Sequence, residues 1–198
     1  IGGSLSSLFN DYMPNVKQER LKIFLSELKI QVKNLEEKSL NIDKIQTPEY
    51  AYIFEKCFRG VSENYQTERL DAYRAILINS LIESAPSDDK ADLFISYVNN
   101  LSIIHIRVLS LFNNFPQYCR KNNLEINNII QNEFTIIYPK LNFKVDFDIF
   151  CSTCEQLFLQ GLTTHGSNIK KLIRTECLND REKALTKLGI EFVDFITL

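Results

Sequence analysis

The C-terminal part of this chain constrains its fold more than any other stretch, because two helical patterns are joined there through a glycine. Apolar spacing predicts one helix over Cys151–Gln160. Gly161 follows at the position where many helices end on a left-handed residue, and Leu162 can then fold back onto Leu157. Thr186 suits the N-cap of a closing helix.

A polar span over 163–183 separates these two helical patterns. Helix, short strand, polar loop, short strand and helix is the element order of a winged-helix module. We therefore expect a degenerate winged-helix-like region with a small β-ribbon within Leu162–Ala184. A fold alone does not name a function, so any functional argument must come from particular sites.

Upstream of this region, apolar residues recur at steps of three and four, which predicts helices. In the first helix the apolar face includes Phe24 and Leu25, and the opposite face carries lysines. A later helix, Ile103–Asn113, is apolar on most sides, so we expect it to be the most buried helix. The pattern predicts five helices in this part of the chain. Proline and capping residues indicate that they begin after Pro14-Asn15, and at or just after Thr47-Pro48, Thr67, Ser87 and Ser102.

Composition supports a mainly α fold. The chain has 198 residues, of which 44% are hydrophobic, and its six glycines and five prolines are few for a turn-rich sheet protein. This length suits one medium domain or two small ones. The patterns predict a helical bundle over 1–100 and a winged-helix-like region over 101–198 packed on it.

Cysteine usage and hydropathy indicate a cytoplasmic protein. The five cysteines are odd in number and three of them lie in apolar helical patterns, unlike a secreted disulfide framework. No apolar run has the length of a membrane span. Membrane engagement is expected only through the N-terminal segment, where Leu5, Leu8, Phe9 and Tyr12 fall at helical steps. This stripe could cover the chain's own bundle, pair with a second subunit, or continue into an upstream membrane segment.

Few residues suggest catalysis or ligand binding. Cys151 and Cys154 have a spacing compatible with zinc or redox chemistry, but they lie in an apolar helix and lack a second ligand pair, so we interpret them as core residues. His105 is expected to be a core or cap-bonded imidazole, and His165 a solvated turn residue. There is no Gly-rich phosphate loop. We expect no catalytic residue, no cofactor and no metal.

Charge disfavours nucleic-acid binding. The formal net charge is −2, and the stretch from Val145 to Ile169 contains no lysine or arginine. A recognition helix needs cations for phosphates and polar groups for base edges. The alternative hypothesis, a winged-helix DNA-binding regulator, would depend on three cations in the predicted wing: Lys170, Lys171 and Arg174.

Two parts of the chain resemble the Abi-alpha-like family of poorly characterised bacterial proteins. One is the helical pattern over about 65–112, which includes Leu101-Ser102-Ile103-Ile104-His105. The other covers about 150–198, with a helix, a Gly-Leu exit and the ending Leu185-Thr186-Lys187-Leu188-Gly189-Ile190-Glu191-Phe192. The resemblance implies an accessory role in phage defence and supplies no site residue. Together with the missing catalytic motifs, it leads us to expect a non-catalytic module that binds a protein partner or forms a homo-oligomer.

Overall fold

The computed structural model describes residues 13–34, 40–82, 84–121, 123, 138–141, 143–165 and 180–198. In these residues the protein is mainly helical, as predicted, and contains no β-strand. The chain divides into two compact units. Unit 1 comprises Ile1–Asn100 together with Phe195–Leu198, and unit 2 comprises Leu101–Asp194. The last four residues, predicted with the second region, thus belong to unit 1.

The helices follow in chain order. Those of unit 1 are α2 (Met13–Asn34), the 3-10 helix η3 (Ile42–Gln46), α3 (Pro48–Glu63), α4 (Thr67–Asn79) and α5 (Asp88–Asn100). Those of unit 2 are α6 (Ile103–Asn113), α7 (Phe115–Lys121), the 3-10 helix η4 (Tyr138–Leu141), α10 (Phe147–Leu159) and α13 (Arg181–Ala184). The final helix, α14 (Lys187–Ile196), begins in unit 2 and ends in unit 1.

The predicted helix starts agree with the structure where capping side chains act locally. Thr47 accepts a hydrogen bond from the Tyr50 backbone N–H at 3.2 Å, and Pro48 occupies the first position of α3. Residue Asp88 opens α5 directly after Ser87, and Ile103 opens α6 directly after Ser102. These are short-range interactions, which explains why the sequence predicts them well.

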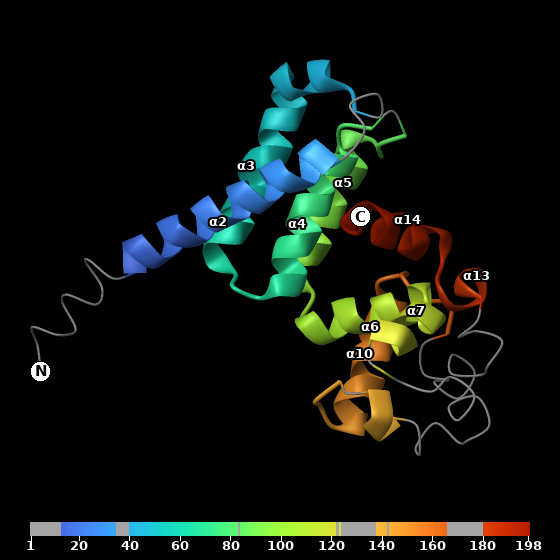
Figure 1. The fold of residues 1–198 in the computed structure, drawn as a ribbon. Coiled ribbons are helices and arrows are strands. Elements are labelled where there is room, and N and C mark those ends of the chain that lie inside the picture. The colour runs from blue at the N-terminus through green and yellow to red at the C-terminus, as the bar shows by residue number, and fades with distance from the viewer. Residues whose placement is uncertain are drawn as a thin grey trace, which may run out of the picture. The chain divides into compact units, whose positions relative to one another are not determined.

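Unit 1 is built around α4 rather than around the helix that looked most apolar. Seven consecutive residues of α4, Ala72–Ile78, are buried. This helix packs on α3 and α5, and α2 crosses α3 and α4 (Figure 1). Helix α6 is also largely buried, with six buried residues among its eleven, but within unit 2. Helix α4 has seven buried residues among its thirteen, so the two helices are buried to the same extent, and those of α4 include a charged residue.

That charged residue is Arg74, which is only 5% exposed. Its guanidinium forms ion pairs with Glu27 on α2 and with Asp71 one turn earlier on α4. It also lies over the ring of Phe24, with its central carbon 5.7 Å from the ring centroid. A buried charge is tolerated only when it is paired. Arg74 thus helps to hold α2 against the bundle, together with the fully buried Phe24.

Unit 2 has a core of aromatic side chains around α6 and α10. Phe143 and Phe150 are fully buried, and their ring centroids lie 5.1 Å apart. Tyr138 packs on both rings and donates a hydrogen bond from its hydroxyl to the Val145 carbonyl at 2.5 Å. Such aromatic contacts bury a large area, so they fill a core that has no tryptophan.

The predicted end of α10 is confirmed. Gly161 has a φ of +72°, in the left-handed region, and the Leu162 N–H donates to the Leu157 carbonyl at 2.9 Å. Thr186 caps α14 by accepting from the Gly189 N–H at 3.0 Å. The Thr186 hydroxyl in turn donates to the Gly161 carbonyl at 2.5 Å. The two helix ends are therefore joined directly by hydrogen bonds.

The predicted β-ribbon is not shown. Thr163 and Leu185 form an isolated antiparallel bridge, and residues 166–179 of the expected ribbon lie outside the described part of the chain. The described part of unit 2 is helical apart from this bridge and its connecting turns. In this region the structure shows helices and the one isolated antiparallel bridge between Thr163 and Leu185 among the described residues.

Candidate functional site

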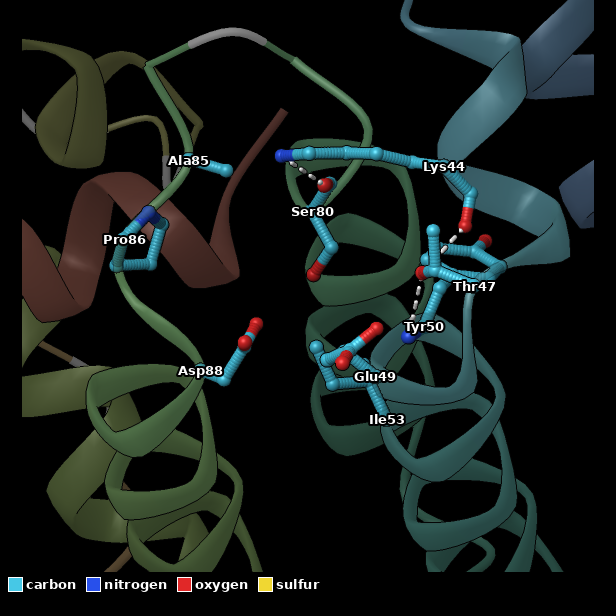
Figure 2. Close-up of a pocket in the computed structure, with 9 residues that line it drawn as sticks. All are labelled: Lys44, Thr47, Glu49, Tyr50, Ile53, Ser80, Ala85, Pro86 and Asp88. Atoms are coloured by element: carbon cyan, nitrogen blue, oxygen red, sulfur yellow. Dashed lines mark hydrogen bonds between the residues drawn. The ribbon is translucent and has the colours of Figure 1, made fainter.

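One cavity of about 180 Å³ lies in unit 1, where η3, the start of α3 and the end of α4 meet (Figure 2). The Lys44 ammonium extends across it and donates to the carbonyls of Ser80 at 3.3 Å and Ile82 at 3.5 Å. A cation satisfies the last carbonyls of a helix well, because those groups have no partner within the helix. Lys44 therefore has a structural role as a cap of α4.

The other polar groups of this cavity also have structural roles. Tyr50 donates from its hydroxyl to the Leu77 carbonyl at 3.2 Å, and burial, with a smaller contribution from Cys57, raises the pKa of Tyr50 to about 12. Glu49 and Asp88 are exposed carboxylates in the first turns of α3 and α5, where the helix dipole favours negative charge. The residues lining the cavity thus offer no activated nucleophile with a base beside it.

The buried histidine of unit 2 has the cap-bonded role that the sequence suggested. His105 Nδ1 lies 3.2 Å from the backbone nitrogen of Ser102, whose N–H donates to it, and 2.6 Å from the Ser102 hydroxyl. With Nδ1 as the acceptor, the proton sits on Nε2, which donates to Gln156 Oε1 at 2.8 Å. The neutral imidazole closes a capping box and links α6 to α10.

This role predicts a pH-dependent stability. Burial lowers the pKa of His105 below its ordinary value of 6.5, an effect that the hydrogen bond to Gln156 partly opposes. The unfolded chain therefore binds the proton more readily, so stability should be complete above about pH 6.5 and fall as the pH drops below it. We expect His105→Asn to remove this fall, measured as the difference in urea-unfolding free energy between about pH 7 and pH 5.

The second histidine provides the matched control. His165 lies in the turn after α10, half-buried, with its Nδ1 2.7 Å from the Thr164 hydroxyl. His165→Asn should keep the pH dependence of the wild-type chain. A His105→Asn variant that loses as much stability on acidification as the wild type would show that other groups cause the dependence.

The thiols of Cys151 and Cys154 lie on one helix in surroundings that favour their protonated form. Cys154 is fully buried in α10, and burial, with Cys151 as the second cause, raises the pKa of its thiol. Cys151 is half-buried, and its thiol pKa is also raised, mainly by burial. Raised pKa values keep both thiols protonated and unreactive. No group of three metal-ligating side chains is found among the described residues, and Cys177 lies outside them.

Two sets of predicted functional residues fall outside the described part of the chain. These are the cations of the alternative DNA-binding hypothesis, Lys170, Lys171 and Arg174, and the N-terminal stripe of Leu5, Leu8, Phe9 and Tyr12. The structure therefore leaves both hypotheses as they were.

The outer face of α2 exposes large aliphatic side chains. Among the residues of this 22-residue helix whose burial is described, Phe24 alone lies in the buried core, although eight of them are aliphatic or aromatic. Ile23 is 50% exposed and Ile30 is 59% exposed, and their spacing of seven places them on the same face. Leu25, which the sequence assigned to the inner face, is 40% exposed. The exposure of the two isoleucines was not predicted from the sequence, although their seven-residue spacing was an available signal.

Basic side chains accompany these isoleucines. Lys22, Lys29 and Lys33 lie on the exposed side of α2 next to Ile23 and Ile30. The helix has two carboxylates: Glu27 is paired with Arg74, and Glu19 lies 3.9 Å from Lys22 in an ion pair that is largely exposed. Exposed pairs of this kind contribute little. The outer face of α2, defined by Lys22, Ile23, Lys29, Ile30 and Lys33, thus combines exposed aliphatic groups with positive charge.

Within the described residues, no single helix is both long and apolar enough to cross a membrane. Helices α5 and α6 meet that criterion only when taken together across the bend between them. Comparison of the chain with protein-family models, with curated proteins and with solved structures found no match.

Proposed function

We propose that this chain is a non-catalytic interaction module, and that α2 presents its binding surface. The observation that supports this is the exposure of Ile23 and Ile30 on a helix whose described residues contribute only Phe24 to the buried core. Large aliphatic side chains exposed in a row on one helix are typical of surfaces that bind another macromolecule. The polar groups of the cavity and of His105 are already used structurally, which is consistent with a protein that performs no chemistry.

The biological setting that we propose follows from the resemblance to the Abi-alpha-like family. In that setting the chain is a cytoplasmic accessory of phage defence that binds a protein partner or a second copy of itself. We also propose that residues 101–198 form a degenerate winged helix. The antiparallel bridge between Thr163 and Leu185 supports this, because it pairs the backbone at the two ends of the predicted wing. A DNA-binding role through Lys170, Lys171 and Arg174 is the second candidate, which the lack of cations from Val145 to Ile169 disfavours.

Self-association provides the direct test. We expect the chain to associate weakly in solution, and Ile23→Ser with Ile30→Ser to weaken this association at least about tenfold, because about 100 Å² or more of apolar surface is lost from the contact. The lysines of two copies repel each other, so added salt should strengthen the association. Sedimentation velocity over a range of protein and salt concentrations measures both effects.

A matched control uses two other exposed aliphatic residues of unit 1, Ile45 and Leu93, which are 48% and 40% exposed. Their replacement by serine should leave the association unchanged. The Ile23→Ser, Ile30→Ser variant should keep the wild-type melting temperature, because isoleucine and serine have similar helix propensities and neither position is buried. A wild-type chain that stays monomeric up to about 1 mM would exclude self-association.

A further inference from the structure

We propose that the outer face of α2 docks on an anionic lipid membrane. This inference rests on the proposed role of α2 as the binding surface and names the chemistry of the surface that it binds. Two rows of side chains run side by side along the helix. Ile23 and Ile30 form the aliphatic row, and Lys22, Lys29 and Lys33 form the basic row.

The positive charge of the outer face of α2 favours an anionic surface over a second copy of the chain. A second copy of the chain would bring the same three lysines to the contact, and the two rows would repel each other, so self-association through this face should be weak. An anionic surface instead gains from every lysine that approaches it, while the isoleucines enter the boundary between headgroups and acyl chains. The acidic side chains of α2 oppose this only weakly, because Glu27 is held by Arg74 and Glu19 stands beside Lys22.

The shape of α2 favours a membrane over a discrete acidic site on a protein. The basic row extends over twelve residues, from Lys22 to Lys33, or about 16 Å of helix. This row lies on the exposed side of α2. It lines no part of the cavity of unit 1, whose lining residues belong to η3, α3, the end of α4 and the start of α5. Lysines on such a surface do not fix the positions of individual carboxylates on a protein partner. They suit a membrane, because its phosphates form a continuous layer and need no defined spacing opposite the lysines.

The position of α2 in unit 1 leaves this face accessible. Figure 1 shows the helix crossing the other helices of unit 1, with its N-terminal turns reaching past α3 and α4. The described hydrogen bonds and ion pairs between α2 and the other helices of unit 1 involve the inner face of α2. Arg20 donates to the carbonyls of Val61 at 3.4 Å and Ser62 at 2.9 Å, and Glu27 pairs with Arg74. Within unit 1 the lysines and isoleucines of the outer face take no part in these contacts, so they remain available to another surface.

Vesicle binding of the whole chain tests the proposal. The probes are large vesicles of phosphatidylcholine with one-third phosphatidylglycerol, and vesicles of phosphatidylcholine alone. We expect binding to the anionic vesicles only, weakened by salt. Each lysine near an anionic surface contributes about a fivefold factor in affinity, so Lys29→Glu with Lys33→Glu should weaken binding about thirtyfold or more. Co-sedimentation with vesicles at increasing lipid concentration measures the loss.

The matched control reverses two exposed lysines of unit 2, Lys183 and Lys187. This variant has the same net charge as Lys29→Glu with Lys33→Glu, so it should lose less than about threefold in affinity if the binding is localised on α2. Equal losses in the two variants would overturn the proposal, as would a lack of binding to anionic vesicles at low salt. Lysine-dependent binding to poly-L-glutamate without vesicle binding would also overturn it, and would indicate an acidic protein partner instead.

The salt dependence separates this inference from the proposed function. Self-association through the isoleucine row should strengthen with salt, whereas membrane docking should weaken. Self-association without vesicle binding would agree with the proposed interaction module and would exclude docking on a membrane. Vesicle binding that is unchanged in the Ile23→Ser, Ile30→Ser variant and in the Lys29→Glu, Lys33→Glu variant would overturn membrane docking by α2. Self-association that is also unchanged in the Ile23→Ser, Ile30→Ser variant would overturn the proposed function of α2.

Discussion

Replacing Gly189 by alanine should destabilise unit 2 by at least about 3 kcal/mol, although alanine normally stabilises a helix interior by about 1 kcal/mol relative to glycine. A Cβ atom at this position would stand 2.0 Å from the Leu162 carbonyl oxygen and 2.9 Å from its carbon. Both of these are backbone atoms, so no side-chain rotation relieves the clash. The same Leu162 oxygen accepts a hydrogen bond from the Thr186 N–H at 3.2 Å. Helix α14 would have to move away and lose the contacts that cap it.

Urea unfolding followed by circular dichroism measures this loss. The control is Lys187→Ala, an exposed substitution in the same helix, which should change the free energy of unfolding by less than about 0.5 kcal/mol. If Gly189→Ala is neutral or stabilising, the close approach of α14 to the turn after α10 is wrong.

Replacing Leu109 by aspartate should have a comparable or larger effect. Leu109 is 1% exposed in the middle of α6, the helix that packs on α7, α10 and α13. An unpaired carboxylate there must be desolvated or protonated, and the packing of the leucine is lost as well. The combined cost is about 4 kcal/mol or more, which is a large part of the stability of an ordinary domain. We expect little soluble protein on expression.

Leu93→Asp is the matched control, because Leu93 is a helical leucine that is 40% exposed. It should cost less than about 1 kcal/mol and leave the soluble yield unchanged. A folded Leu109→Asp variant with the wild-type melting temperature would contradict the place of α6 in the core of unit 2.

Local features of this protein were predictable from the sequence because local interactions decide them. Thr47 and Pro48 start α3, Gly161 ends α10, and Thr186 starts α14, each through contacts within a few residues. The cap-bonded role of His105 belongs to the same class, since its partner Ser102 is three residues away. The link from His105 to Gln156 was not predictable, because it joins residues 51 positions apart.

Long-range packing decided the features that the sequence did not reveal. The pattern of α4 contains an arginine amid apolar residues, and this normally indicates that a helix has a solvent-exposed side. In the structure Arg74 is buried, because Glu27 from α2 and Asp71 supply the opposite charges. The partner on α2 is 47 positions away, so no local pattern indicates it.

The sequence by itself determined that this chain folds into helices, where several of them begin and where α10 ends, because capping, proline and glycine act over a few residues. Tertiary structure decided which side chains of each helix are buried. On α2, Phe24 and Leu25 have similar hydrophobicity, yet Phe24 is 1% exposed and Leu25 is 40% exposed. The positions of α3 and α4 determine which side of α2 faces the core. Whether Ile23 and Ile30 are core or binding surface therefore depends on the neighbouring helices, and the spacing of apolar residues within α2 does not contain that information.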